Sequence, residues 1–383
     1  VMFMAVYLDH NATTPVDEAV LAAMLPFFRE RYGNASSRHE WGTVARKAVN
    51  AAREQVAEAV GAQPAQVVFV SGGSEANNLF LKGAAVYLKP AQVAVSGVEH
   101  PCVLKPAQDL ARQGWKVRQL AVDGCGRVDL DDVAQALAEP TGIVSVMLAN
   151  NETGVIQDVA AVAAQARKTG ALMHTDSVQA FGKIEVDFSA LQVHAMTLSA
   201  HKIYGPKGAA ALVLDKRVAL KPLIMGGGHE NGLRAGTENV PAIVGFGVAA
   251  QLAKARLKEL DDRLRGMQAQ VEQGLTELGA TIFGAAASRL PNTSYFSFPG
   301  IDGETLVIQL DRQGYGVAAG AACSSASPGL SQVLTAMGIE PELARGAVRM
   351  SLGKDNTTEQ VEDFLQAVGR VVAEMRRLTA MAV

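Results

Sequence analysis

Cysteine is scarce in this chain, and its scarcity excludes a small disulfide-stapled fold. The 383 residues contain three cysteines, Cys102, Cys125 and Cys323. None falls in a Cys-x-x-Cys or Cys/His spacing that would hold a structural zinc ion, so we expect no metal site. Scattered thiols are typical of a reducing compartment, which predicts a cytoplasmic protein. We expect Cys102 and Cys125 to be buried and inert, the commoner fate of a free thiol.

An excess of one charge and long apolar runs are lacking as well. The chain has 35 Lys and Arg against 38 Asp and Glu, a formal net charge of −3, so it lacks the basic excess of a general nucleic-acid binder. No apolar run approaches the roughly 20 residues of a membrane span, and residues 1–8 lack the basic start of a signal peptide. We expect neither nucleic acid nor a membrane among the partners. Hydrophobic residues, at 49%, indicate a large folded core.

Short apolar runs rich in β-branched residues alternate with helical patterns through the first part of the chain. Near-continuous apolar strands spaced by helices are typical of a mostly parallel sheet that is covered on both faces. Helices are predicted at 103–112 and 130–137, among others. The predicted strands are residues 67–70, 93–96, 117–122, 143–148, 171–175, 196–199 and 209–214.

The pattern changes after Pro241, where residues 242–278 read as one long helix. Strands are predicted at 293–298 and 316–319, and a last helix begins at a capping box formed by Thr357 and Gln360. These patterns predict an α/β fold with a large domain and a smaller α+β domain at the C-terminal end. We place the large domain at residues 16–255 and the small domain at 256–383, and expect residues 1–15 to pack across both.

Lys202 and Asp176 each follow a predicted apolar strand. They are 26 residues apart, enough for a helix and one more strand, so both side chains can meet at one edge of the sheet. Pyridoxal phosphate needs such a pair, because a lysine forms a Schiff base with its aldehyde and a carboxylate keeps its ring nitrogen protonated. Taken singly, Lys202 reads as a surface lysine and Asp176 as a helix N-cap.

Two further segments follow strands in the same way. Gly72, Gly73 and Ser74 open a helix, where backbone N–H groups bind an anion such as phosphate. Their spacing does not match a nucleotide-binding loop. His100 can lie over a planar cofactor and move protons, because its pKa is near neutrality. Taken alone, it would more often be a buried structural histidine.

Together these segments resemble the cysteine desulfurases, which are fold-type-I pyridoxal-phosphate enzymes. Many matches in order and at family spacing are more specific than any single motif. The resemblance implies a fold-type-I transferase of the form with a long, mobile cysteine loop. It runs nearly end to end, through residues 7–15, 33–39, 71–78, 99–100, 150–154, 176–179, 199–208, 226–230, 234–239 and 348–353.

The resemblance also implies a role for each matching residue. Lys202 would carry the cofactor, Asp176 would pair with its ring nitrogen, and His100 would stack on the ring and assist proton transfer. Arg349 would bind the substrate carboxylate, together with Asn151. The other cofactor contacts that it implies are Gly73, Ser74, Asn151, Gln179, Ser199, His201 and, toward the phosphate of a second subunit, Thr237.

Cys323 is the residue on which the implied activity depends. In the family, this cysteine takes the sulfur of L-cysteine as a persulfide, releases L-alanine and passes the sulfur to an acceptor. The segment departs from the family pattern Ser-Ser-Gly-Ser-Ala-Cys, because alanines and Gly320 fill positions 318–322. The resemblance further implies a homodimer and an acceptor protein, such as a scaffold for iron–sulfur cluster assembly or a carrier for tRNA thiolation.

Other activities on this fold stay open at this point. An aminotransferase or a selenocysteine lyase would share Lys202 and Asp176, and a non-catalytic scaffold subunit would share the fold. The joint presence of Lys202, Asp176, His100, Cys323 and Arg349 favours an enzyme.

Overall fold

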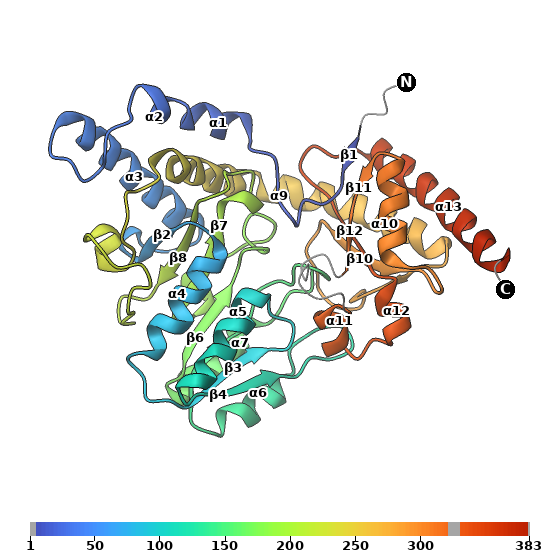
Figure 1. Ribbon diagram of the computed structural model, residues 1–383, viewed down its shortest axis with the longest axis horizontal. Coiled ribbons are helices and arrows are strands. Elements are labelled where there is room, and N and C mark those ends of the chain that lie inside the picture. Colours follow the sequence, from blue (N-terminus) through green and yellow to red (C-terminus); the bar gives the residue numbers. More distant parts are fainter. Residues whose placement is uncertain (1–4, 321–329, 382–383) are drawn as a thin grey trace.

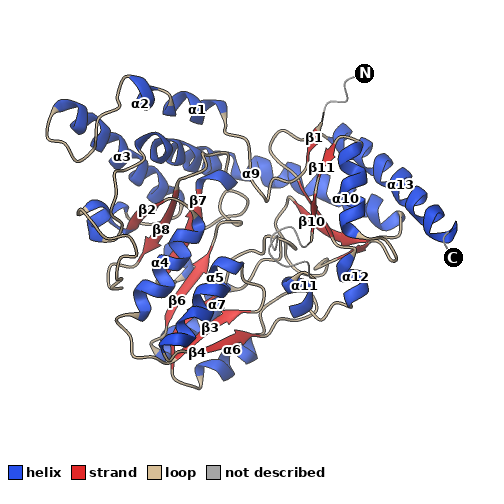
Figure 2. Ribbon diagram, viewed as in Figure 1, coloured by secondary structure: helices blue, strands red, loops and turns tan. Residues whose placement is uncertain are grey.

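The computed structural model describes residues 5–320 and 330–381, and Cys323 lies outside these ranges. Helices and strands alternate along the chain in an α/β fold (Figures 1 and 2). The largest sheet has seven strands, β2 (Val67–Val70), β3 (Gln92–Ser96), β4 (Lys116–Leu120), β5 (Thr141–Ser145), β6 (Leu172–Asp176), β7 (Ala195–Ser199) and β8 (Ala210–Leu214).

This sheet is mostly parallel, as the sequence predicts. Its order is β2-β8-β7-β6-β5-β3-β4, in which β3 to β7 pair in parallel with their neighbours. The exception is β8, which runs antiparallel to both β2 and β7. The strand predicted at 117–122 ends earlier, at Leu120, because the next N–H, that of Ala121, donates to the Asp132 carboxylate.

Helices cover both faces of the sheet (Figure 2). Alternate residues of β2 point to opposite sides, so Phe69 joins one hydrophobic cluster and Val68 joins the other. The helices of this region are α1 (Glu18–Met24), α2 (Pro26–Arg29), α3 (Glu40–Ala59), α4 (Gly73–Ala85), α5 (Pro101–Leu110), α6 (Leu130–Leu137), α7 (Val159–Thr169) and α8 (Phe188–Leu191).

One long helix, α9 (Val240–Glu277), runs from this sheet to a second layer of structure (Figure 1). Phe246 near its start packs in the core of the seven-stranded sheet, and Val271 near its end packs in a separate core. By length and composition α9 could cross a membrane, but half of its apolar window is buried inside the protein, as in a core helix.

The second layer contains a four-stranded and a two-stranded sheet among the described residues. The strand predicted at 316–319 is two short strands in different sheets, because the chain crosses between them at the buried Val317. The elements are β1 (Val6–Tyr7), β9 (Thr281–Ile282), β10 (Thr293–Ser297), β11 (Tyr315–Gly316), β12 (Ala318–Ala319), β13 (Val348–Ser351), α10 (Gly303–Arg312), α11 (Gln332–Ala336), α12 (Pro341–Arg345) and α13 (Thr358–Met381).

The segment before α1 contacts both layers. β1 pairs in parallel with β11, and Leu8 is buried in the core around α13. A few residues later, the N–H of Thr14 donates to the carbonyl of His201, at the end of the large sheet. This path brings residues 9–14 between the two layers, beside the edge of the sheet that carries Lys202.

The outer edge of β2 is covered by side chains instead of another strand. Arg53 on α3 donates to the carbonyl of Val67, and Glu230 accepts the N–H of Phe69. Arg53 and Glu230 also form an ion pair with two hydrogen bonds of 2.7 and 2.8 Å. The pair therefore satisfies backbone groups that an edge strand would otherwise expose.

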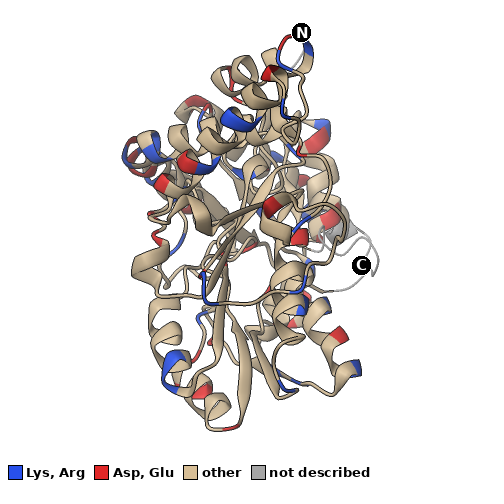
Figure 3. Ribbon diagram, turned by 90° about the vertical axis from the view of Figure 1, so that its left-hand side faces the viewer, with Lys and Arg blue, Asp and Glu red and all other residues tan. Residues whose placement is uncertain are grey.

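Charged residues of both signs are interspersed along the described ribbon (Figure 3). This distribution agrees with the formal net charge of −3, and the view of Figure 3 shows no region in which basic residues alone are gathered.

Candidate active site

The predicted site residues lie at the carboxyl ends of neighbouring strands. Asp176 is the last residue of β6, and Ser199 is the last residue of β7, which pairs with β6. Gly73 begins α4 after β2, and His100 caps α5 after β3. An open α/β sheet binds ligands at this edge, so its topology brings these residues toward one site.

Asp176 is a buried carboxylate that is held by two donors. Its Oδ1 accepts the N–H of Val178 at 3.0 Å, and its Oδ2 accepts Nδ2 of Asn77 at 2.8 Å. The two hydrogen bonds fix the orientation of the carboxylate, which is therefore placed to pair with a protonated ring nitrogen.

Lys202 ends a short 3₁₀ turn, Ala200–Lys202, directly after β7. Its Nζ donates to the main-chain carbonyls of Asn11 at 2.5 Å and Ala12 at 2.7 Å. Both acceptors belong to the segment that runs between the two layers. The amine is thus positioned by the N-terminal part of the chain, which a reading of the sequence around Lys202 could not show.

Asn11 and Lys183 form a network behind Lys202 that sequence reasoning missed. The buried amine of Lys183 donates to Oε1 of Gln179 at 2.7 Å and to Oδ1 of Asn11 at 3.1 Å. Gln179 in turn donates from Nε2 to the carbonyl of Asn11 at 2.9 Å. Desolvation, followed by the positive charges of Lys202 and Arg349, holds the pKa of Lys183 well below its usual range.

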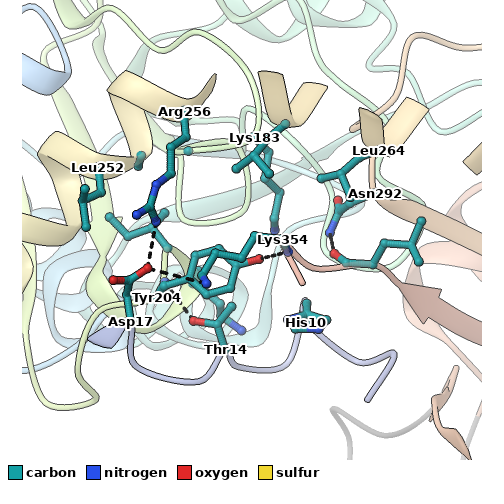
Figure 4. A pocket seen from close by; sticks show the side chains of 16 residues that line it. His10, Thr14, Asp17, Lys183, Tyr204, Leu252, Arg256, Leu264, Asn292 and Lys354 are labelled. Carbon is teal, nitrogen blue, oxygen red and sulfur yellow. Dashed lines mark hydrogen bonds and ion pairs between the residues drawn. The ribbon is translucent and has the colours of Figure 1, made fainter. Parts of the chain in front are cut away.

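A small cavity of about 30 Å³ adjoins this network (Figure 4). Lys183, Asn292 and His10 line it, and the ion pair between Asp17 and Arg256, at 2.7 Å, lies on its other side. Burial lowers the pKa of His10 to about 4, so this histidine is neutral at pH 7.

The residues around Asp176 and α4 fit pyridoxal phosphate. The N-terminal end of α4 has no side-chain cap from Gly72, which leaves a helix terminus that favours a phosphate. The hydroxyls of Ser177 and Ser199 are buried without a partner among the described residues. Buried polar groups are normally hydrogen-bonded, so two such hydroxyls close to the site indicate a polar ligand.

His100 lies beside Asp176 and Lys202. Desolvation lowers its pKa, Asp176 raises it and Lys202 lowers it, in decreasing order of effect. The preceding residue, Glu99, is buried and accepts the Ser96 hydroxyl at 2.7 Å. Burial raises the pKa of Glu99 to about 8, so that its carboxyl is largely protonated at pH 7.

The predicted substrate residues lie on the other side of the site. Arg349, in β13, is buried, pairs with Asp9 at 2.7 Å and donates to the carbonyl of Asn151 at 2.9 Å. Its Nε has no partner among the described residues. An arginine with an unused donor in this position can bind a carboxylate.

The structure places the remaining predicted residues as follows. Nδ1 of His201 is 3.1 Å from the Thr13 hydroxyl. Thr237 is exposed and, with Ser71, lines a separate cavity of about 200 Å³. Cys323 lies outside the described residues, so its predicted role stays a prediction.

The expected burial of Cys102 and Cys125 is wrong, because both are only partly buried. Cys102 lies on the first turn of α5, where its Sγ is 2.9 Å from Nδ1 of His100. The His100–Pro101–Cys102 spacing places both residues at the start of one helix, which is the signal that could have identified this contact.

Sequence comparison relates the chain to known proteins over nearly its full length. A family model described as aminotransferase class-V matches residues 6–364. The chain is 42% identical over 380 residues to a cysteine desulfurase of Gluconacetobacter diazotrophicus, covering 98% of this chain and 95% of that protein. It is 40% identical over 380 residues to a cysteine desulfurase IscS of Dictyoglomus turgidum, covering 98% and 96%.

Solved structures give the same result. A NifS-like protein superposes with a TM-score of 0.92 at 39% identity, covering 97% of this chain and 100% of that one. A protein described as SspA in complex with cysteine has a TM-score of 0.81 at 32% identity, covering 90% and 98%.

Proposed function

This chain belongs to the class-V aminotransferase family as a pyridoxal-phosphate-dependent cysteine desulfurase, and from that premise we propose that Cys323 accepts the sulfur of L-cysteine. The single observation that supports this best is the meeting of Lys202, Asp176 and His100 at one sheet edge in a chain about 40% identical to cysteine desulfurases. A cysteine desulfurase also needs a thiol that accepts sulfur, and Cys323 stands at the sequence position of that cysteine in the family.

The proposed reaction conserves atoms and electrons. The Cys323 thiolate attacks the substrate sulfur, an S–S bond forms, and the bond between sulfur and Cβ breaks. The electron pair of that bond goes to carbon, which takes up a proton and becomes the methyl group of L-alanine. Sulfur is oxidised to the persulfide level and carbon is reduced, so no outside oxidant or reductant is required.

Cofactor binding, substrate binding and proton transfer are assigned to other residues of the chain. Pyridoxal phosphate, when bound, supplies an electron-accepting ring that stabilises negative charge next to the substrate nitrogen. Lys202 would carry it, Asp176 would pair with its ring nitrogen, and α4 with Ser74 and Ser199 would hold its phosphate. Arg349 binds the substrate carboxylate, and His100 moves protons next to Lys202.

We also propose that two chains form a homodimer. Large apolar side chains are exposed on α2 and α3, on either side of α2 and in the loop before Gly226, and such side chains favour a protein interface. Ser36 and His229 are hydrogen-bonded at 3.0 Å, which shows that these segments lie on one side of the molecule. The exposed side chains are Leu25 (55%), Phe28 (59%), Tyr32 (67%), Trp41 (56%) and Met225 (68%).

The acceptor and the compartment are part of the same proposal. A persulfide on a surface segment can be handed to the thiol of another protein, such as a scaffold for iron–sulfur assembly or a tRNA-thiolation carrier. The few scattered cysteines support a reducing, cytoplasmic location.

The division of the chain into a domain of residues 16–255 and a domain of residues 256–383, with residues 1–15 across both, is supported by separate hydrophobic clusters.

The test is the Cys323→Ser variant of the holoenzyme. We expect sulfide release from L-cysteine to fall by about 1,000-fold or more, because the nucleophile is lost. The visible absorption of the bound cofactor should not change, because Lys202 and Asp176 are intact. Mass spectrometry after exposure to L-cysteine should find one added sulfur on the Cys323 peptide of the parent protein and none in the variant.

Cys125→Ser is the matched control, since Cys125 is a partly buried thiol for which we propose no role in the reaction. It should release sulfide at the parent rate. Unchanged activity of Cys323→Ser, or added sulfur on another cysteine of the parent, would refute the assignment. Transfer of the amino group to a keto acid without sulfide would instead indicate an aminotransferase.

A further inference from the structure

Two hydrogen bonds to one ring atom determine where His100 carries its proton. Nδ1 of His100 accepts the main-chain N–H of Cys102 at 3.2 Å, as the cap of α5, and lies 2.9 Å from Sγ of the same cysteine. A ring nitrogen that accepts an N–H bond presents its lone pair and has no proton, and this one lone pair can be shared by two donors. The single proton of the neutral ring is therefore on Nε2.

The direction of the thiol hydrogen follows from the neighbouring amide. Nδ2 of Asn77 donates to Oδ2 of Asp176 at 2.8 Å, and an ionised carboxylate can only accept, so the amide orientation is fixed. The same Nδ2 also lies 3.1 Å from Sγ of Cys102, so sulfur accepts from Asn77. The Ser74 hydroxyl also donates to Sγ, so the S–H group is directed to Nδ1 of His100, the neighbour that has a lone pair and no hydrogen.

The charge state of Cys102 agrees with this direction. Burial, with the negative charges of Asp176 and Glu99, raises the pKa of the thiol to about 12, and hydrogen bonds from Asn77 and Ser74 oppose the rise only in part. Cys102 therefore stays a thiol at neutral pH. A thiolate is the reacting form of cysteine, so this sulfur is a poor nucleophile although it lies beside a histidine.

We propose that Cys102 is a positioning residue, whose thiol donates to Nδ1 of His100 and holds the ring in the neutral Nε2–H tautomer, and that it is not a second sulfur acceptor. A second proton on the ring would have to enter at Nδ1, against the N–H and S–H groups of Cys102. His100 is thus kept neutral and delivers its proton from Nε2. The kinetic test of this proposal depends on the proposed function, and the measurement of the tautomer does not.

The charged groups around His100 come from several elements. Asp176 on β6 favours its protonated form, Lys202 after β7 opposes it, and Cys102 on α5 blocks Nδ1. Replacing Cys102 by alanine leaves Asp176 and Lys202 in place and removes one donor to Nδ1. Burial and Lys202 still lower the pKa of His100 in this variant, so we expect only a partial rise of that pKa when the donor is lost.

The experiment observes the ring directly in the holoenzyme. Nitrogen-15 NMR of histidine-labelled protein reports which ring nitrogen is protonated, and a His100→Gln sample assigns the signal. The parent protein should show the Nε2–H tautomer from pH 6 upward. Cys102→Ser, which keeps a donor, should give the same spectrum. Cys102→Ala should show a raised His100 pKa.

Kinetics give a second readout. For Cys102→Ala we expect kcat/KM for L-cysteine to fall about threefold to tenfold, the effect of one lost hydrogen bond, and its acid limb to move to higher pH. Cys102→Ser should keep kcat/KM close to the value of the parent protein, because serine also donates a hydrogen bond. Cys125→Ala, a thiol-to-methyl control for which we propose no role, should follow the parent profile.

Several outcomes would overturn the proposal. An Nδ1–H signal in the parent protein would show the opposite tautomer, and no variant is needed to observe it. Added sulfur on Cys102 after exposure to L-cysteine would make it an acceptor. An unchanged pH profile in a folded Cys102→Ala would deny it any positioning role. The tautomer is measured without turnover, so this result stands apart from the Cys323→Ser test.

Discussion

The amine of Lys183 is buried next to a second lysine, Lys202, and no carboxylate of the described residues forms an ion pair with it. Its two hydrogen bonds go instead to the amide oxygens of Gln179 and Asn11. Each bond fixes which end of an amide faces the amine. Because Gln179 and Lys202 both donate to the Asn11 carbonyl, Lys183 helps to set the position of the reactive amine.

We expect Lys183→Met to lower kcat/KM for L-cysteine by about tenfold. Methionine has a similar length but donates no hydrogen bond, so the amide oxygen of Gln179 loses its lysine partner, at about 1–3 kcal/mol for a buried group. Oδ1 of Asn11 keeps the hydrogen bond from Nδ2 of Asn292 at 3.1 Å. Steady-state kinetics on the holoenzyme would measure the effect. Lys168→Met, on the exposed face of α7, is the matched control. If the two variants behaved alike, Lys183 would have no part in positioning.

The residues that sequence alone could identify are those next to strand ends. The sequence predicts that Lys202 and Asp176 lie at one sheet edge, and they follow β7 and β6, which pair in parallel. His100 caps α5 after β3 of the same sheet, and the roles of these residues stay a prediction. Lys183 could not be found in this way, because its partner Asn11 lies 172 residues away in the chain. The burial of Cys102 could not be predicted, because a free thiol is buried more often than not, whereas here the thiol is only partly buried beside His100, whose side chain caps α5.

At the scale of elements, the described residues on either side of the segment that carries Cys323 both lie near Tyr295. Ser331, which caps α11, donates to Oε2 of Glu152 at 2.5 Å, and Tyr295 donates to the same oxygen at 3.1 Å. On the other side, a Cβ on Gly320 would lie 2.3 Å from the Tyr295 hydroxyl, so only glycine fits there. Ser331 is therefore held by a hydrogen bond to Glu152, and Gly320 packs closely against Tyr295.

We expect Ser331→Ala to slow persulfide formation severalfold while the cofactor spectrum stays unchanged. The free energy of unfolding should fall by about 2 kcal/mol, from the lost helix cap and the lost partner of Glu152. Single-turnover kinetics and denaturant titration measure the two effects. Asp302→Ala removes the cap of α10, away from Glu152, and should lower stability without slowing the reaction. Equal rates in both variants would contradict the attachment.

The sequence predicts helices and strands best where the pattern of apolar residues is strong and depends only on residues close together in the chain. The strand at 67–70 and the helix at 130–137 agree with β2 and α6 to the residue. The capping box of Thr357 and Gln360 forms as predicted, with both reciprocal hydrogen bonds at 3.3 Å. The antiparallel direction of β8 was not predictable, since the direction of a strand depends on the path of the chain between strands.

For the whole molecule, buried titratable groups determine how stability varies with pH. Burial lowers the pKa of His10 and His201 to about 4 and that of His174 to about 3, below the ordinary 6.5. The unfolded chain then binds more protons than the folded one, so stability falls as the pH drops below 6.5. Glu99, with its pKa raised from 4.5 to about 8, acts oppositely and removes stability as the pH rises between those values.

We therefore expect the free energy of unfolding to fall as the pH drops below 6.5, where three histidines outweigh one carboxyl. Above pH 6.5 the ionisation of Glu99 lowers it by about 1.4 kcal/mol for each pH unit, and the lowered pKa of Lys183 acts in the opposite direction. Denaturant titrations at pH 5, 6.5 and 8 would measure the curve. Glu99→Gln cannot ionise, so it should gain stability relative to the parent protein as the pH rises from 6.5 to 8. A variant whose curve runs parallel to that of the parent over that interval would contradict the assignment.

The ion pair of Arg53 and Glu230 affects how the β2 edge can associate with other molecules. It occupies the side of β2 on which another strand would add, and it engages the carbonyl of Val67 and the N–H of Phe69. An apolar edge strand with open backbone groups is a template for aggregation. At this edge the sheet thus ends in two charged side chains, and a second molecule cannot add a strand along β2.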